Sequence, residues 1–207
     1  MSLDQTIQHM FPTVIAPREG ELEEPCNFGT RYVAASGGLW REVALPWMTM
    51  LHLIAPSVVA LPYGDAKPYV KLKCGPIPNV LRREFCRDAI AALPDESAAA
   101  FIWNAETGEW RYCLRPALRA SADYIEYFEV LLGPEEHLVL DMHSHGTFPA
   151  FFSSQDDSDD RGTMRFSGVI GSLDSEEMTS VVRLNMLGMC WDASVTPDGT
   201  LEVTLCN

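Results

Sequence analysis

Two histidines that could bind a metal ion stand one residue apart at the end of an apolar segment. His143 and His145 follow a stretch, from His137, in which apolar residues recur at every second position. This period is typical of a β-strand, so we expect both imidazoles on one face. Zinc takes about four ligands in a tetrahedral array, and a catalytic site leaves one position for water. The pair therefore supplies half of a metal site.

A third ligand can come from the acidic run that follows. Asp156 lies beyond a loop long enough to fold back, and Ser153 precedes it by three residues. Each half of this pattern also has a simpler explanation. Many H-x-H pairs on strands bind no metal, and Ser153-x-x-Asp156 is also typical of a helix N-terminus, with a serine cap and an acid near the helix dipole. The two halves together at this spacing favour a metal site.

The complete pattern, H-x-H-x7-S-x2-D, resembles the signature of the JAMM (MPN-type) zinc metalloproteases. The N-terminal third and the segment HSHGTFPAFFSSQDD further resemble the PRTRC system protein A group, a plasmid-associated branch of that family. The resemblance implies zinc as the cofactor, His143, His145 and Asp156 as its ligands, and Ser153 as a catalytic residue. Many family members have proline after the second histidine. Gly146 stands there in this chain, which implies a more mobile loop or one shaped for another substrate.

The family also needs an upstream glutamate, near the start of a strand that follows a helix. Glu96 matches this position, and Glu106 and Glu109 are alternatives in an expected turn one strand later. The resemblance implies that Glu96 is the general base that takes a proton from a metal-bound water. Ser153 would donate to the oxyanion of the tetrahedral intermediate. The implied reaction is hydrolysis of an amide, peptide or isopeptide bond.

The resemblance also implies partners for the chain. Related enzymes cut at the C-terminus of ubiquitin-like β-grasp proteins, and PRTRC cassettes resemble systems that encode an E1/ThiF-like protein. The expected substrate is therefore the tail of a ubiquitin-like or sulfur-carrier protein, with an E1/ThiF-like protein as a further partner. Two alternatives stay open: a non-catalytic MPN-like interaction scaffold, and a metal-dependent hydrolase of small amides.

These residues need a sheet to position them. Segment 79–93 has apolar residues at helical spacing, with Asn79 as the expected cap and Pro94 as the stop. Alternating segments predict strands before and after this helix, and 121–130 fits either a strand or a helix. The expected strands are Arg31–Ala35, Leu39–Leu45, Val58–Pro62, Tyr69–Cys74, Ser97–Trp103, Glu109–Leu114, His137–His143, Phe166–Ser172, Val181–Met189, Cys190–Ser194 and Leu201–Leu205. The sequence thus predicts an α+β fold, a JAMM/MPN-like mixed β-sheet flanked by helices.

A domain boundary is predicted at Gly75-Pro76-Ile77-Pro78, where turn-forming residues interrupt the strand pattern. Residues 1–75 would form a small β-rich accessory region, with 1–30 polar and irregular. Residues 76–207 would form the metal-dependent hydrolase domain.

The net charge of −14 disfavours nucleic acid and anionic membranes as partners. The apolar segment 44–61 is interrupted by Pro46, His52 and Pro56, so it is not expected to span a membrane. The N-terminus lacks the pattern of a signal peptide, and the six cysteines form no C-x-x-C pair. We therefore expect a cytoplasmic protein.

Overall fold

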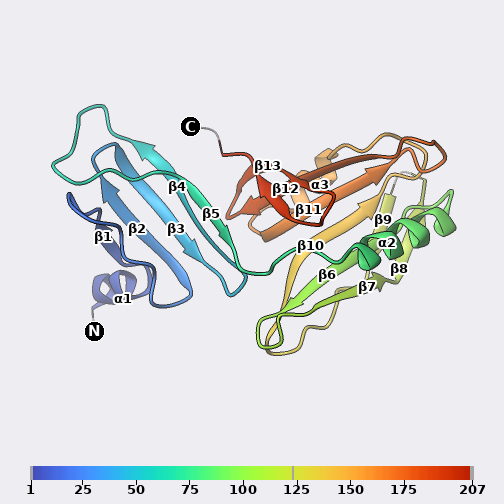
Figure 1. The fold of residues 1–207 in the computed structure, drawn as a ribbon, viewed down its shortest axis with the longest axis horizontal. Helices are drawn as coiled ribbons and strands as arrows, with labels where there is room; N and C mark the ends of the chain where they lie inside the picture. The colour runs from blue at the N-terminus through green and yellow to red at the C-terminus, as the bar shows by residue number, and fades with distance from the viewer. Residues whose placement is uncertain (1, 123, 206–207) are drawn as a thin grey trace. The chain divides into compact units, whose positions relative to one another are not determined.

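A computed structural model describes residues 2–122 and 124–205 of the chain (Figure 1). Asp123, inside the segment of ambiguous period, lies outside the described residues. The chain divides into two compact units, a first that extends to Lys73 and a second from Cys74 to Thr204. Strands predominate over helices in the described residues, so the expected α+β class is confirmed. None of the described helices has the length and apolar character that a membrane crossing requires.

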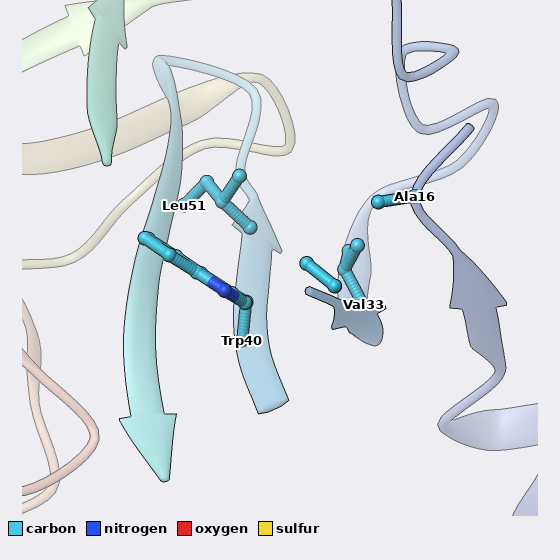
Figure 2. Close-up of a cluster of buried hydrophobic side chains, with 5 residues drawn as sticks. Ala16, Val33, Trp40 and Leu51 are labelled. Atoms are coloured by element: carbon cyan, nitrogen blue, oxygen red, sulfur yellow. The ribbon is translucent and has the colours of Figure 1, made fainter. Parts of the chain in front are cut away.

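The first unit is a five-stranded sheet in the order β1-β2-β3-β4-β5, preceded by helix α1 (Figure 1). Strand β1 runs parallel to β2, and the other neighbours are antiparallel. Figure 2 shows the small apolar cluster on this sheet, in which Trp40 and Leu51 lie near Val33 and Ala16. The bounds are α1 Leu3–Met10, β1 Thr13–Ile15, β2 Gly29–Ala35, β3 Gly38–Ala44, β4 Met48–Pro56 and β5 Tyr69–Leu72.

Two sequence predictions for this unit were wrong. Residues 1–30 are not irregular throughout, because Ser2 and Gln5 form a capping box that starts α1, and β1 follows. Segment 58–62 is not a strand. The strand of this region is β4, which begins after Pro46 and has Pro56 as its last residue. Proline lacks a donor, so it is tolerated at a strand end and does not exclude a strand between two prolines.

The second unit contains a seven-stranded sheet in the order β14-β13-β12-β11-β10-β6-β7, with a separate β8–β9 hairpin. Its strands are β6 Ala98–Asn104, β7 Trp110–Arg115, β8 Ala117–Ser121, β9 Tyr124–Tyr127, β10 Glu136–Ser144, β11 Met164–Gly171, β12 Thr179–Met186, β13 Met189–Val195 and β14 Leu201–Val203. Helices α2 (Asn79–Ala92) and α3 (Ser154–Asp159) complete the unit. Within the ambiguous segment, residues 124–127 form a short strand that pairs with β8.

Helix α2 packs on the β6–β7 side of the sheet. The ring of Phe85 meets Phe101 of β6 edge-on, with 6.2 Å between centroids, and the hydroxyl of Tyr112 donates to Asp88. Asn79 is not the cap that the sequence predicts. Pro78 occupies the cap position, and the amide of Asn79 instead bonds to the loop between β13 and β14. Strand β12 ends at Met186, earlier than predicted. Leu187 and Gly188 both have positive φ and form the tight turn between β12 and β13.

Strands β10 and β11 are parallel neighbours, whereas the other neighbouring pairs described in this sheet are antiparallel. Parallel neighbours cannot be joined by a tight hairpin, so the chain must cross back along the sheet between them. Residues 145–163 make this crossover, and α3 lies within it. The crossover begins where the two histidines stand.

Candidate metal centre

The end of β10 and the start of β6 are fastened to each other by two hydrogen bonds. The backbone N–H of Ser144 donates to the carbonyl of Ser97 over 2.8 Å, and the N–H of Ser97 donates to the hydroxyl of Ser144 over 3.0 Å. On the other side, the N–H of His145 donates to the carbonyl of Ile170 at the end of β11. The antiparallel register, continued past Ser144, places Glu96 opposite His145. Three strands therefore position this corner of the sheet.

The two imidazoles and one carboxylate converge at this corner. Nε2 of His143 lies 3.1 Å from Nε2 of His145 and 3.4 Å from Oδ1 of Asp156. The ligand atoms of all three residues lie within 4.8 Å of one another. The sequence separates Asp156 from the histidines, and the crossover brings it back to them.

These distances fit a tetrahedral zinc ion. Ligand atoms at about 2.0–2.2 Å from a tetrahedral centre lie roughly 3.3–3.6 Å from one another. The 3.4 Å between His143 and Asp156 matches this edge, and the 3.1 Å between the imidazoles is slightly shorter. Two nitrogens that face each other so closely require either a shared proton or a cation between them. Two imidazoles and a carboxylate are also ligand types that catalytic zinc sites use, so the donor set fits this ion.

Burial keeps both imidazoles in the form that binds metal. Desolvation lowers the pKa of His143 and of His145, although the carboxylate of Asp156 opposes the shift in both. Both rings are therefore neutral at neutral pH. The backbone of Pro149, which can only accept, takes a hydrogen bond from the His145 ring. A ring whose proton is held there presents its other nitrogen as a lone pair, which is the usual arrangement for a metal-binding histidine.

Asp156 divides its two oxygens between separate tasks. Oδ2 accepts hydrogen bonds from the N–H and the hydroxyl of Ser153, over 2.6 and 2.7 Å, while Oδ1 faces His143. Ser153 is the N-cap of α3, and its hydroxyl oxygen accepts the N–H of Asp156 in a complete capping box. The simpler interpretation of this pair, a helix cap, therefore holds. The cap does not compete with metal binding, because it uses Oδ2 of Asp156 while Oδ1 still faces His143.

Glu96 is 7% exposed and lies in the same pocket as the three ligand residues. The alternatives Glu106 and Glu109 are exposed in the turn after β6 and do not line this pocket. The seven residues of β6 separate that turn from the site by roughly 20 Å. Of the three glutamates, Glu96 is the one whose backbone lies beside the histidines.

Aromatic and apolar side chains form much of the pocket wall. Phe148 and Phe151 come from the crossover, and the ring of Phe151 packs edge-on against His145 at 4.5 Å. The β8–β9 hairpin supplies Tyr124 and Tyr127, which the sequence analysis missed. Their segment has an ambiguous period, but tyrosines beside an isoleucine are common in strands and could have favoured a hairpin. The other lining residues are Ala122, Ile125, Gln155 and Asp159.

Gly146 explains why this chain departs from the usual proline. Its φ is 55°, in the left-handed region, whereas the ring of proline fixes φ near −65°. Gly171 also shapes the loop, since a Cβ there would lie 2.2 Å from the carbonyl oxygen of Phe148. The loop is therefore seated closely on β11, and the greater mobility suggested for it is not needed to explain the glycine.

Two family models match the chain, one in each unit. A family model described as prokaryotic homologs of the JAB domain matches residues 78–184, which is half of the chain. The chain therefore belongs to this family, within the JAB/MPN class. A second family model, described as a domain of unknown function (DUF2016), matches residues 1–73. No curated protein matches the chain.

Proposed function

We propose that the second unit is a zinc-dependent hydrolase that cleaves a peptide or isopeptide bond. The observation that carries this proposal is the convergence of His143, His145 and Asp156 beside the buried Glu96, in a pocket open to solvent. The JAB family includes metallopeptidases and also inactive members, so membership alone does not decide the activity. A scaffold has no physical need for three aligned ligands with a carboxylic acid beside them.

Each residue has a distinct task in the proposed reaction. Zinc held by His143, His145 and Asp156 would supply an activated water and polarise the scissile carbonyl. Glu96 takes the proton from the attacking water and returns it to the leaving amine. The Ser153 hydroxyl, which lines the same pocket, turns from Asp156 and donates to the developing oxyanion.

The proposed substrate is the C-terminal tail of a ubiquitin-like or sulfur-carrier protein, within a PRTRC-like system in the cytoplasm that also holds an E1/ThiF-like partner. This rests on the motif and on the family, with one supporting feature of the pocket. Tyr124, Phe148 and Phe151 line it, so the pocket offers aromatic contacts to an extended chain segment.

Two measurements test the proposal. Metal analysis of the purified chain should give about one zinc per monomer, and His143→Ala should abolish it. A panel of peptide, isopeptide and small-amide substrates should then give zinc-dependent cleavage of the peptide or isopeptide bonds. A folded protein that binds no zinc would favour the interaction scaffold. Zinc-dependent cleavage of small amides alone would favour the small-amide hydrolase.

A further inference from the structure

Helix α3 carries the ligand Asp156 but is poorly suited to hold it still. It has six residues, none of them buried. A helix this short is not stable on its own in water, so contacts from outside it must fix its position. The capping box with Ser153 orders the first turn internally but does not attach the helix to the sheet.

Arg183, in the middle of β12, makes that attachment. Its guanidinium donates from Nη1 to Asp157 over 2.5 Å, and from Nε and Nη2 to Asp160 over 3.0 and 2.7 Å. The same guanidinium lies over the ring of Phe152 at 3.9 Å. Phe152 precedes the cap residue, and the two aspartates follow the ligand. Arg183 therefore holds the segment on both sides of Asp156 without a hydrogen bond to the ligand itself.

The far end of this attachment is itself anchored. Asp160 also accepts a hydrogen bond from the hydroxyl of Ser167 on β11, over 2.7 Å, and Asn185 of β12 donates to that hydroxyl over 2.9 Å. Arg183 is 8% exposed and Asn185 4%, so water competes little for these bonds. A planar guanidinium bound to two carboxylates through a fork has a fixed orientation, which an ammonium group cannot reproduce.

We infer that Arg183 is a positioning residue, which places the carboxylate of Asp156 at the distance from His143 that metal binding needs. The inference rests on the proposed function, because it assigns Asp156 a metal ion. A role in sheet stability alone does not account for the contacts. The hydrogen bonds of the guanidinium run to the crossover segment and not to the strands beside β12.

The test compares zinc affinity in Arg183→Ala, Arg183→Lys and a matched control, Arg111→Ala. Arg111 of β7 makes a similar forked pair with Glu136, over 2.9 and 2.6 Å, at a distance from the site. Affinity is measured by competition with a chromophoric chelator, at a temperature where circular dichroism shows each variant folded. We expect Arg183→Ala to weaken zinc binding by about 10- to 100-fold, as loss of an outer-shell partner does. The zinc affinity of Arg183→Lys should lie between those of Arg183→Ala and the wild type, and the zinc affinity of Arg111→Ala should equal that of the wild type.

Hydrogen exchange gives a second measurement that needs no metal. In the metal-free protein, the N–H groups of Asp157 and Asp160, which close the turns of α3, should exchange faster in Arg183→Ala than in the wild type. If Arg183→Ala does not fold, Asp157→Ala removes one acceptor of the guanidinium at an exposed residue and should weaken zinc binding more than Arg111→Ala does.

The outcomes separate the two proposals. Wild-type zinc affinity in Arg183→Ala, or an equal loss in Arg111→Ala, would overturn the positioning role while the zinc site stands. A wild-type protein that binds no zinc would overturn the proposed function and, with it, the role assigned to Asp156. In that case unchanged exchange in α3 would show that Arg183 does not hold the helix either.

Discussion

Each unit contains a sequestered carboxylate, and the two are used differently. In the first unit, Glu42 is 1% exposed, and both of its oxygens have fixed donors, the guanidinium of Arg31 and the hydroxyl of Tyr69. In the second unit, Asp156 is 19% exposed and commits one oxygen to Ser153. Its other oxygen faces an imidazole, which burial keeps neutral at neutral pH.

The comparison shows how a structural carboxylate differs from one placed for chemistry. Burial, and then its hydrogen bond to Glu42, raise the pKa of Tyr69, so the phenol remains a donor at any physiological pH. The Glu42 cluster is thus complete within the protein. The cluster at Asp156 brings two imidazole nitrogens and a carboxylate oxygen together, and a proton or a cation between them would relieve the repulsion among their lone pairs. The candidate site therefore differs from the Glu42 cluster in that only one oxygen of its carboxylate is held by a donor, and the other faces the histidines beside a pocket.

The largest effect is expected from Asp156→Ala. Removal of a metal ligand should abolish zinc binding and hydrolysis together, because binding needs the full ligand set. Metal analysis and a cleavage assay on the same preparation measure both. Asp174→Ala, which removes an exposed carboxylate that does not line the pocket, is the control and should keep its zinc. Full zinc content in Asp156→Ala would remove this carboxylate from the site.

The next effect is expected from Glu96→Gln. The amide preserves size and hydrogen bonding but cannot accept the proton, so zinc should stay bound while the cleavage rate falls by about two to four orders of magnitude. Glu109→Gln is the control and should be fully active. A fully active Glu96→Gln would move the general base to Glu106 or Glu109, or remove the mechanism.

Ser153→Ala should have a smaller effect. Zinc should be retained, and the rate should fall by about two to three orders of magnitude if the hydroxyl is the oxyanion donor. The loss of the cap should also destabilise α3 by about 1 kcal/mol. Ser154→Ala, one residue along, tests for a general effect of the substitution. A rate within a fewfold of wild type would leave Ser153 with its capping role alone.

The smallest effect on the site is expected from Glu42→Leu. Zinc content and cleavage should be unchanged, whereas breaking the buried pair with Arg31 should destabilise the first unit by about 3–5 kcal/mol. Thermal unfolding of the full chain measures the loss. Glu24→Gln, which breaks an exposed pair with Lys71, should leave the unfolding midpoint almost unchanged, because solvent screens that pair. If folded Glu42→Leu lost its zinc, the Glu42 cluster would contribute to metal binding, contrary to the comparison above.

The sequence was sufficient to predict the parts of the molecule that depend on local pattern. Alternation predicted β10, and fixed spacing predicted that His143, His145 and Asp156 belong together, a prediction that metal analysis has yet to test. Helix α1 and strand β4 were not predicted, because one begins in a polar segment and the other lies between prolines.

Arg183 also escaped the sequence analysis, for a different reason. Its partners lie more than twenty residues away, on α3 and at the C-cap that follows it, and no spacing rule connects them. An arginine within the apolar run VVRLNM does carry one signal. A charged residue at the centre of a buried strand requires a buried partner, and four aspartates lie in the preceding crossover.

The parallel pairing of β10 and β11 has a consequence for how this site can change over time. A hairpin loop can be shortened to two residues without altering the strands that it joins, but a crossover between parallel neighbours cannot. Deletions that leave fewer than about a dozen residues between β10 and β11 would therefore break the parallel pairing at the centre of the sheet. Point substitutions at His143, His145 or Asp156 carry no such cost to the sheet. A relative that lacks one of these three residues should therefore still keep a crossover of at least about a dozen residues.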